Sequence, residues 1–254
     1  MIRTTAAIAL AAVAIGPAQA QEQAEPQQVL VVVAHPDDEL FMAPAIASLA
    51  RQGHAVSILF ATIGDQGPGV SSLAKGAALG EVRRGEATCS AKALGAEARF
   101  LQGLGDGTLA ATPQAPDSPA RGFLDQFADA YLDVMPDLVL TWGPDGGYGH
   151  ADHRMVSALT VQAVQSLEPE IRARLLHVGI PNGSLPPVAE MSSWATTDPA
   201  LLTETIAYTP ADLAAANAAA LCHATQFDEP SRRGMMGLFD ATMWRGRVHF
   251  RPGF

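Results

Sequence analysis

The chain has 254 residues, of which 26 are acidic and 16 are basic, and its formal net charge at pH 7 is −10. Nucleic-acid affinity depends on neutralising phosphates, so an acidic chain with scattered Lys and Arg is a poor candidate for that role. The same charge disfavours docking on an anionic membrane surface.

The first twenty residues have the composition of a secretory signal peptide. Arg3 is followed by an uncharged, mostly apolar stretch over residues 4–16, and Ala18-Gln19-Ala20 is a small-x-small cleavage site. The apolar stretch is shorter than the ~20 residues that a membrane span needs. We therefore predict a signal peptide over residues 1–20, a mature N-terminus at Gln21, and an exported protein, periplasmic or secreted, without a membrane span.

The first strong signal of the mature chain is an apolar run that ends in a cluster of polar side chains. The run 29–33 predicts a buried parallel strand, and Ala34-His35-Pro36-Asp37-Asp38-Glu39 follows it directly. Open α/β folds bind ligands at the carboxyl ends of such strands. Imidazole and carboxylate groups are ligands for zinc and its divalent neighbours. His35 and Asp38 can reach one ion while Asp37 stays free to act as a base.

The same hexapeptide also fits an ordinary helix start. Proline is common in the first helical turn, and the helix dipole favours acidic side chains there. Taken alone, the hexapeptide does not decide between a metal site and a helix cap. Glu39 either supports a metal site from behind the ligands or is only a first-turn acid, and we favour the second interpretation.

Strands and helices alternate along the rest of the chain, which predicts one α/β domain over residues 21–254. Alternation of this kind is typical of a Rossmann-like, mostly parallel sheet that is flanked by helices. The predicted strands cover 28–34, 54–61, 98–102, 137–142 and 174–180, with a further one over 203–208, and the predicted helices cover 39–52, 71–95, 120–134, a segment that ends near 167, and 211–226. The tail over 232–254 has no interpretable pattern.

A second polar motif follows the strand predicted over 137–142. Gly149-His150-Ala151-Asp152-His153 comes after a loop of Gly, Pro and Asp, and His150 and His153 share one face of a helix start. A lone His is more often structural than a ligand, but two His around an Asp at a strand end are much less often accidental. Because both motifs follow strands of one sheet, we expect them at the same edge. The metal site is then the better interpretation.

Together these residues resemble the PIG-L or LmbE-like zinc-dependent de-N-acetylases, over roughly residues 31–226. The resemblance is carried by the two motifs and by shorter matches at Thr62-x-Gly64, Arg83-x-x-Glu86, Ala93-Leu94-Gly95, Asp106-Gly107 and His223-x-Thr225-Gln226. It implies a catalytic zinc ion, or another divalent metal, held by His35, Asp38 and His153 with one position open. It also implies that Asp37 is the general base.

The resemblance assigns roles to further polar residues. His150 would stabilise the developing oxyanion, most usefully when protonated, and Asp152 would orient His150 by accepting a ring N–H. Arg83, Asp106 and His223 resemble substrate-side positions. The alternative for Arg83 is a helix-surface ion pair with Glu86. The role of His223 is open because alanines at 214–216 replace a basic residue that the family commonly carries.

The implied function is removal of an acetyl group from an N-acetylated amino sugar of the N-acetylglucosamine type. A serine hydrolase is excluded because the chain lacks a Gly-x-Ser-x-Gly elbow. A dinucleotide-binding enzyme is excluded because the first turn carries acids where that fold needs glycines. The remaining alternative is an exported, non-catalytic glycan-binding module on the same fold. Asp37 and His150 weigh against it, since binding alone needs neither.

Cys89 and Cys222 are the only cysteines, and both lie in Ala-rich segments. In an oxidising compartment they could form a disulfide. They could equally be two buried small hydrophobic residues. The sequence leaves both possibilities open.

Overall fold

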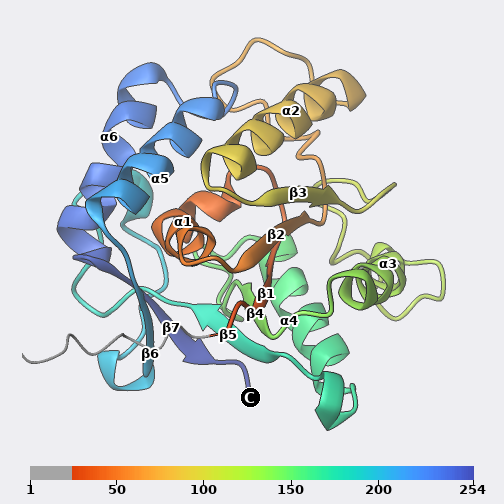
Figure 1. The fold of residues 1–254 in the computed structure, drawn as a ribbon. Coiled ribbons are helices and arrows are strands. Elements are labelled where there is room, and N and C mark those ends of the chain that lie inside the picture. The colour runs from red at the N-terminus through yellow and green to blue at the C-terminus, as the bar shows by residue number, and fades with distance from the viewer. Residues whose placement is uncertain (1–24) are drawn as a thin grey trace, which may run out of the picture.

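The computed structural model describes residues 25–254, so the predicted signal peptide over 1–20 and the predicted N-terminus at Gln21 lie outside the described residues. The chain forms one seven-stranded sheet with helices on both faces (Figure 1). Its strands are β1 Gln28–Val33, β2 Ala55–Phe60, β3 Glu97–Phe100, β4 Leu138–Thr141, β5 Arg174–Val178, β6 Glu204–Ala207 and β7 Arg247–Pro252. Its α-helices are α1 Ala43–Arg51, α2 Ala77–Ala93, α3 Pro119–Val134, α4 Ala151–Gln165, α5 Pro210–Cys222 and α6 Glu229–Phe239.

The sheet is mostly parallel, as the sequence predicts. Its strand order is β3-β2-β1-β4-β5-β7-β6; the strands from β3 to β5 pair in parallel, and β7 is antiparallel to both β5 and β6. Val31 of β1 pairs with Ile58 on one side and Leu140 on the other. The β1 strand is therefore central, and its neighbour β4 ends at the same edge. This brings the two polar motifs together.

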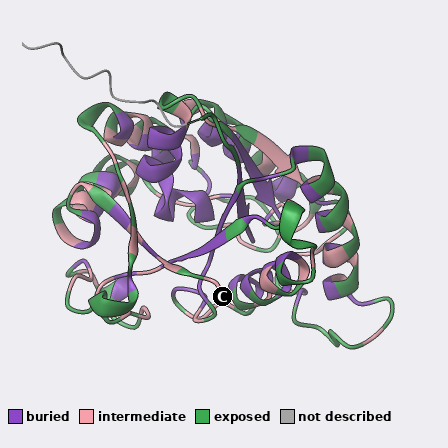
Figure 2. Cartoon of the chain, turned by 60° about the horizontal axis from the view of Figure 1, so that its bottom comes forward, coloured by how far each residue is buried: buried purple, intermediate pink, exposed green. Residues whose placement is uncertain are grey.

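Helices cover both faces of the sheet. Val29, Val31 and Val33 face the layer that contains α1, α2, α5 and α6, whereas Leu30 and Val32 face α3 and α4. All five side chains are completely buried, and Figure 2 shows the sheet as a buried layer between more exposed helices. Burial on both faces explains why the β1 sequence is a continuous apolar run without polar alternation.

The two cysteines form a disulfide that joins α2 to α5. The Cα atoms of Cys89 and Cys222 are 5.8 Å apart, and the residues are separated by 133 positions in the sequence. The disulfide interpretation is therefore the correct one of the two that the sequence left open. Both helices lie on the same face of the sheet, beside α1.

Two predicted helices begin later than expected. The predicted helix over 39–52 is a 3-10 turn, η1 Asp38–Phe41, followed by α1, because Pro44 has no N–H to continue the helical ladder. The predicted helix over 71–95 begins at Ala77. The segment before it is a loop, and the amides of Val70 and Ser71 donate to the carbonyl of Thr225. Tertiary contacts with the C-terminal segment hold these residues out of the helix.

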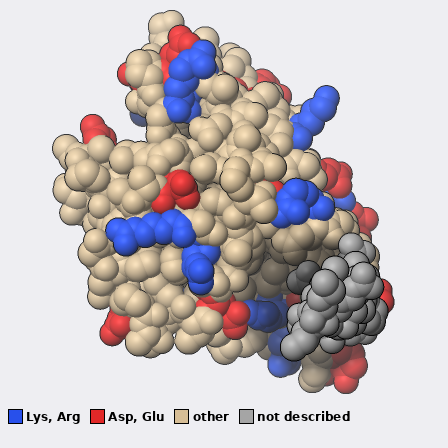
Figure 3. Space-filling model, turned by 60° about the vertical axis from the view of Figure 1, so that its left-hand side comes forward, with Lys and Arg blue, Asp and Glu red and all other residues tan. Residues whose placement is uncertain are grey.

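The tail that the sequence left uninterpreted completes both the sheet and one helical layer. It supplies most of α6, a π-helical turn over Asp240–Trp244, and β7, which inserts between β5 and β6. Within residues 25–254, none of the helices has the length and apolar character needed to cross a bilayer. On the face shown in Figure 3, Lys and Arg lie scattered among Asp and Glu on a largely uncharged surface.

Candidate metal centre and active site

The side chains of His35, Asp38 and His153 meet where β1 and β4 end. Nε2 of His153 lies 3.0 Å from Oδ1 of Asp38 and 3.2 Å from Nδ1 of His35, and this Nδ1 lies 3.7 Å from Oδ2 of Asp38. All three residues are buried. Tetrahedral coordination with bonds of ~2.0–2.1 Å separates ligand atoms by about 3.3 Å. The donor types and their spacing therefore fit a divalent metal ion.

The second nitrogen of His35 faces two carboxylates. Nε2 lies 3.0 Å from Oδ1 of Asp106 and 3.3 Å from Oδ2 of Asp152. Asp152 also accepts the backbone N–H groups of Gly107 at 2.7 Å and Leu109 at 3.1 Å. Burial lowers the pKa of His35, but the hydrogen bonds to the two carboxylates outweigh it and raise this pKa to about 10. Metal-binding imidazoles are commonly oriented by a carboxylate in this way.

His153 is oriented by backbone and by stacking. Its Nδ1 lies 3.1 Å from the carbonyl oxygen of Gly146. A carbonyl can only accept, so Nδ1 carries a hydrogen, and Nε2 is the ring nitrogen that faces Asp38 and His35. The ring of Trp142 stacks on the imidazole, with centroids 4.6 Å apart and an interplanar angle of 11°.

Asp152 contacts a different histidine from the one predicted. The family resemblance implies that its carboxylate accepts a ring N–H of His150, but the carboxylate lies against His35 instead. The backbone N–H of Asp152 donates to Nδ1 of His150 at 3.2 Å. The reason is local: His150 caps the N-terminus of α4, and a capping side chain accepts from the second or third helical amide.

This cap also determines the protonation state of His150. A ring nitrogen that accepts a hydrogen bond is unprotonated, so the bond implies a neutral ring with hydrogen on Nε2. Partial burial lowers the pKa of His150, and the charges of His35 and His153 lower it further. The family resemblance implies a His150 that acts most usefully when protonated. The geometry favours a neutral N–H donor whose ring lies edge-on to His35, with centroids 4.8 Å apart.

Asp38 and Asp37 have opposite electrostatic environments. Burial would raise the pKa of Asp38, but the charge and hydrogen bond of His153 lower it well below its usual range. Burial raises the pKa of Asp37 to about 6, against the opposing charge of Arg83. The Asp37 side chain is 19% exposed, and it lies on the cavity wall. A carboxylate with a pKa near neutrality is well suited to accept a proton.

Asp37 has a left-handed backbone conformation that is unusual for a residue with a side chain, with φ 101°. Its N–H donates to Oε2 of Glu39 at 2.9 Å. Oε1 of Glu39 accepts from Ser90 Oγ at 2.5 Å and from Nε2 of His223 at 2.6 Å. Glu39 and His223 are completely buried. We call Glu39, Ser90 and His223 the Glu39 clamp, since they hold the backbone of Asp37.

Glu39 lies in the first turn of η1, as expected, but it is completely buried and its carboxylate also holds the backbone of Asp37. Burial lowers the pKa of His223, but the charge of Glu39 and its hydrogen bond outweigh this and raise the pKa. His223 contacts Glu39 and lies behind Asp37, so the structure places it outside the cavity lining.

Arg83 is a buried residue that organises the loops around Asp37. Its Nη2 donates to the carbonyl of Pro36 at 2.6 Å, and its Nη1 donates to the carbonyl of Gly64 at 2.7 Å. Nη2 also lies 3.5 Å from Oδ2 of Asp37. The surface ion pair with Glu86 does not form, because Glu86 accepts hydrogen bonds from Thr225 instead.

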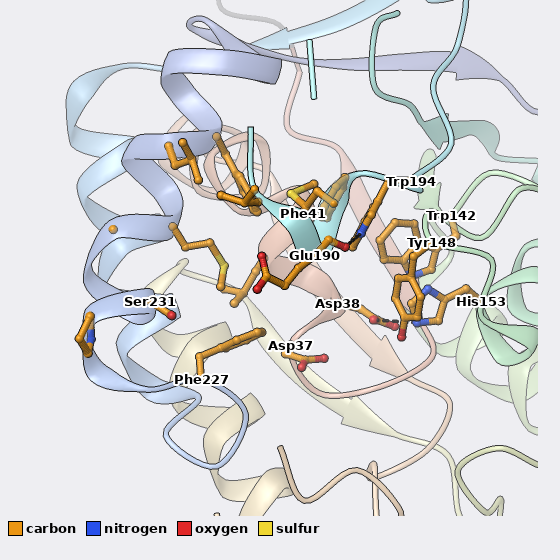
Figure 4. Close-up of a pocket in the computed structure, with 18 residues that line it drawn as sticks. Asp37, Asp38, Phe41, Trp142, Tyr148, His153, Glu190, Trp194, Phe227 and Ser231 are labelled. Carbon is orange, nitrogen blue, oxygen red and sulfur yellow. Dashed lines mark hydrogen bonds and ion pairs between the residues drawn. The ribbon is translucent and has the colours of Figure 1, made fainter. Parts of the chain in front are cut away.

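A cavity of about 650 Å³ opens beside Asp37, Asp38 and His153. Figure 4 shows Asp37 between the metal-ligand cluster and Phe227, with Ser231 on α6 beyond it. Asp106, like Arg83 and His223, is outside the lining: Asp106 contacts His35, behind the proposed ligands. The three residues predicted to contact substrate therefore support the ligands or Asp37 in this arrangement.

Sequence reasoning missed several residues of the site. Ser90 gave no local signal, because it meets Glu39 only through the packing of α2. Tyr148 lines the cavity, and its ring lies 5.1 Å from that of His153 between centroids. Its position directly before Gly149-His150 could have indicated this. Glu39 is followed by Leu40-Phe41-Met42, an apolar run that could have indicated burial.

Comparison with known proteins agrees with the family resemblance of the sequence. The PIG-L family (GlcNAc-PI de-N-acetylase) matches residues 30–164, more than half of the chain. The 1D-myo-inositol 2-acetamido-2-deoxy-alpha-D-glucopyranoside deacetylase of Rhodococcus opacus is 37% identical over 174 residues of alignment, and the match covers 61% of this chain and 58% of that protein. The chain therefore aligns with less than two thirds of this relative.

Solved structures share the fold. N,N'-diacetylchitobiose deacetylase from Pyrococcus horikoshii has a TM-score of 0.66 at 20% identity, covering 90% of this chain and 84% of that one. The 4-carboxy-2-hydroxymuconate hydratase GalB from Pseudomonas putida has a TM-score of 0.62 at 18% identity, covering 90% and 96%. These likenesses show the fold alone, and the second shows that it hosts more than one reaction.

Proposed function

The chain belongs to the PIG-L family of de-N-acetylases, and we propose that it is a metal-dependent hydrolase that removes the acetyl group from an N-acetylated amino sugar of the N-acetylglucosamine type. The observation that carries this proposal is the placement of Asp37. Its carboxylate lies on the cavity wall next to the three candidate ligands, yet it is not one of them. A non-catalytic glycan-binding module would need no base at this position.

His35, Asp38 and His153 would hold the metal, and we propose zinc because two imidazoles, one carboxylate and an open position are typical of catalytic zinc. Such an ion supplies Lewis acidity, which polarises the amide carbonyl and acidifies a nearby water molecule. Other divalent ions also accept these ligands. Asp106 and Asp152 would keep His35 in the orientation that presents Nδ1 to the ion.

The protein side chains would carry the proton transfers. Asp37 accepts a proton from the attacking water, whose oxygen forms a bond to the carbonyl carbon. The Nε2–H of His150 donates to the carbonyl oxygen as negative charge develops on it. Asp37 then returns the proton to the amide nitrogen as the C–N bond breaks. The products are acetate and a free amino sugar.

The amino-sugar assignment is supported by the relatives. The family description names N-acetylglucosamine attached to phosphatidylinositol, and the Rhodococcus relative acts on a 2-acetamido-2-deoxyglucopyranoside. The reacting group that these substrates share is a 2-acetamido group on a glucose ring. We propose the same reacting group here.

The test is a pair of neighbouring substitutions. Asp37→Asn is expected to keep its metal but to lose ~10²–10⁴-fold in acetate release from N-acetylglucosamine and its disaccharide, because an amide cannot take the proton. Asp38→Asn is expected to lose metal. Asp129→Asn, an exposed change on α3, is the matched control.

Metal content is measured on the same preparations as acetate release. If the metal-loaded parent protein released no acetate from any of the amides, the binding-module alternative would replace this proposal. Near-parental turnover of Asp37→Asn would assign the base to another group.

We also propose that the protein acts outside the cytoplasm. The leader pattern over residues 1–20 supports this, and so does the Cys89–Cys222 disulfide, because structural disulfides persist mainly in oxidising compartments. Intact-mass measurement on fractionated cells is expected to find a species that begins at Gln21 in the exported fraction. A full-length cytosolic species would contradict the proposal.

A further inference from the structure

The cavity beside Asp37 continues away from the metal-ligand cluster into a part with mainly apolar walls. Met235, Leu238 and Phe239 of α6 form one wall, and Phe41, Met191 and Trp194 lie on other sides. Phe41 stacks on Trp194, with ring centroids 4.8 Å apart and an interplanar angle of 12°, so this part has a rigid aromatic surface. Figure 4 shows Phe41 and Trp194 above the acidic pair and α6 to the left.

The polar groups in this apolar part are few and not cationic. Glu190 and Ser231 are the polar side chains in this apolar part. The lining of the whole cavity contains neither Lys nor Arg. A phosphate would find no cation here and would face Glu190, Asp37 and Asp38. A second sugar ring would find few hydrogen-bond partners on these walls, whereas an alkyl or aryl group would bury apolar surface against them. The chemistry therefore fits an uncharged, apolar group.

The size of the cavity also exceeds the needs of the reacting group. Pockets of ~300–1,000 Å³ hold drug-sized ligands, and this one measures about 650 Å³. The carbonyl of the acetyl group must lie near Asp37. On the far side of this carbonyl the acetyl group has only one methyl group. Most of the volume is therefore available to a group on the sugar side of the amide bond.

We propose that this apolar part of the cavity, formed with α6, binds an uncharged apolar aglycone, an alkyl or aryl group attached to the N-acetylated amino sugar. This inference rests on the proposed function, and it specifies the class of substrate: amphiphilic glycosides of N-acetylglucosamine. The aglycone lies against α6, and the acetamido group lies at Asp37.

The first experiment measures kcat/KM for acetate release from a series of N-acetylglucosamine glycosides, from methyl to hexyl, below the concentrations at which they aggregate. Each methylene that becomes buried is expected to raise kcat/KM roughly threefold to fourfold, so hexyl exceeds methyl by at least about tenfold. An equal kcat/KM along the series would overturn the inference. Because that result still includes acetate release, it differs from failure of the proposed function, in which no glycoside is hydrolysed.

The second experiment narrows the cavity with a variant that is expected to fold. Gly234 lies in α6 on the cavity wall, and a Cβ there meets nothing within 4 Å. Leu is a better helix former than Gly, so Gly234→Leu fills space without straining the helix. The hexyl-to-methyl ratio of kcat/KM is expected to fall at least about fivefold. Gly237→Leu is the matched control, since Gly237 lies on the same helix, is equally unobstructed and is outside the lining.

Two outcomes would contradict the inference. The first is an equal hexyl-to-methyl ratio in Gly234→Leu and Gly237→Leu, which would place the aglycone elsewhere. The second concerns N-hexanoylglucosamine, in which the long chain is on the acyl side. If this amide were hydrolysed better than N-acetylglucosamine, and Gly234→Leu abolished the advantage, the apolar part would bind acyl chains instead of aglycones.

Discussion

The hydrogen bonds of the Glu39 clamp lead to a specific prediction for the Glu39→Gln variant. Three donors converge on the Glu39 carboxylate: the N–H of Asp37 on Oε2, and Ser90 and His223 on Oε1. A glutamine amide has one accepting oxygen and one donating nitrogen. With its NH₂ group at the Oε2 position, the amide faces the N–H of Asp37, which then loses its acceptor; at the Oε1 position it faces Ser90 and His223, and both of their hydrogen bonds to residue 39 are disrupted.

The magnitude follows from that lost hydrogen bond. A buried donor without a partner costs ~1–3 kcal/mol of unfolding free energy. In a domain of this size each kcal/mol lowers the melting temperature by about 2–4 °C, so we expect a decrease of about 2–12 °C. The left-handed conformation of Asp37 itself costs ~1–3 kcal/mol, and a weakened clamp lets it relax. A displaced base lowers kcat, by up to ~100-fold for a shift of about 1 Å.

The assay combines thermal unfolding, metal content and kcat for acetate release. Metal content is expected to stay at the parental level, because Oδ2 of Asp38 is held separately by the amides of Ala34 and His35. Glu229→Gln is the control, since Glu229 forms an exposed ion pair with Arg233. If Glu39→Gln has the same melting temperature and the same kcat as the parent protein, the reasoning is refuted.

Three further predictions concern the ligands, the oxyanion donor and the disulfide. His35→Ala and His153→Ala are each expected to lose most of the bound metal in elemental analysis, and full occupancy in both would refute the ligand assignment. His150→Ala is expected to lower kcat ~10²–10³-fold with little change in KM, whereas an effect on KM alone would remove His150 from the chemical step. The Cys89→Ser, Cys222→Ser double variant is expected to lose ~2–4 kcal/mol in denaturant unfolding, and parental stability would show that the disulfide contributes nothing.

The predicted sheet and the two strand-end motifs are confirmed by the structure. The run over 29–33 is buried on both faces, so its apolar character is a direct consequence of its place in the middle of a parallel sheet. Adjacent parallel strands end at the same edge. For that reason His35 and His153, which are 118 residues apart in the sequence, could be placed together from local patterns.

The partners of the polar side chains could not be predicted in this way. Asp152 holds His35 instead of His150 because the cap of α4 turns its backbone N–H toward His150 and its carboxylate toward the loop at Gly107. Glu39 is buried because α2 and the C-terminal His223 close over it. These contacts depend on side-chain directions that are set by packing between distant segments.

The order of the elements as far as α5, the parallel core and the candidate ligands can be predicted from the sequence alone, because strand burial and strand-end chemistry are encoded in short, contiguous stretches. The helix start at Ala77, the disulfide, the Glu39 clamp and the apolar part of the cavity depend on packing between segments that are distant in the sequence. The tail over 232–254 illustrates the difference. Its β7 strand lies between β5 and β6, and the α6 residues line the cavity together with Phe41 and Trp194, so the places of both elements depend on contacts between distant segments.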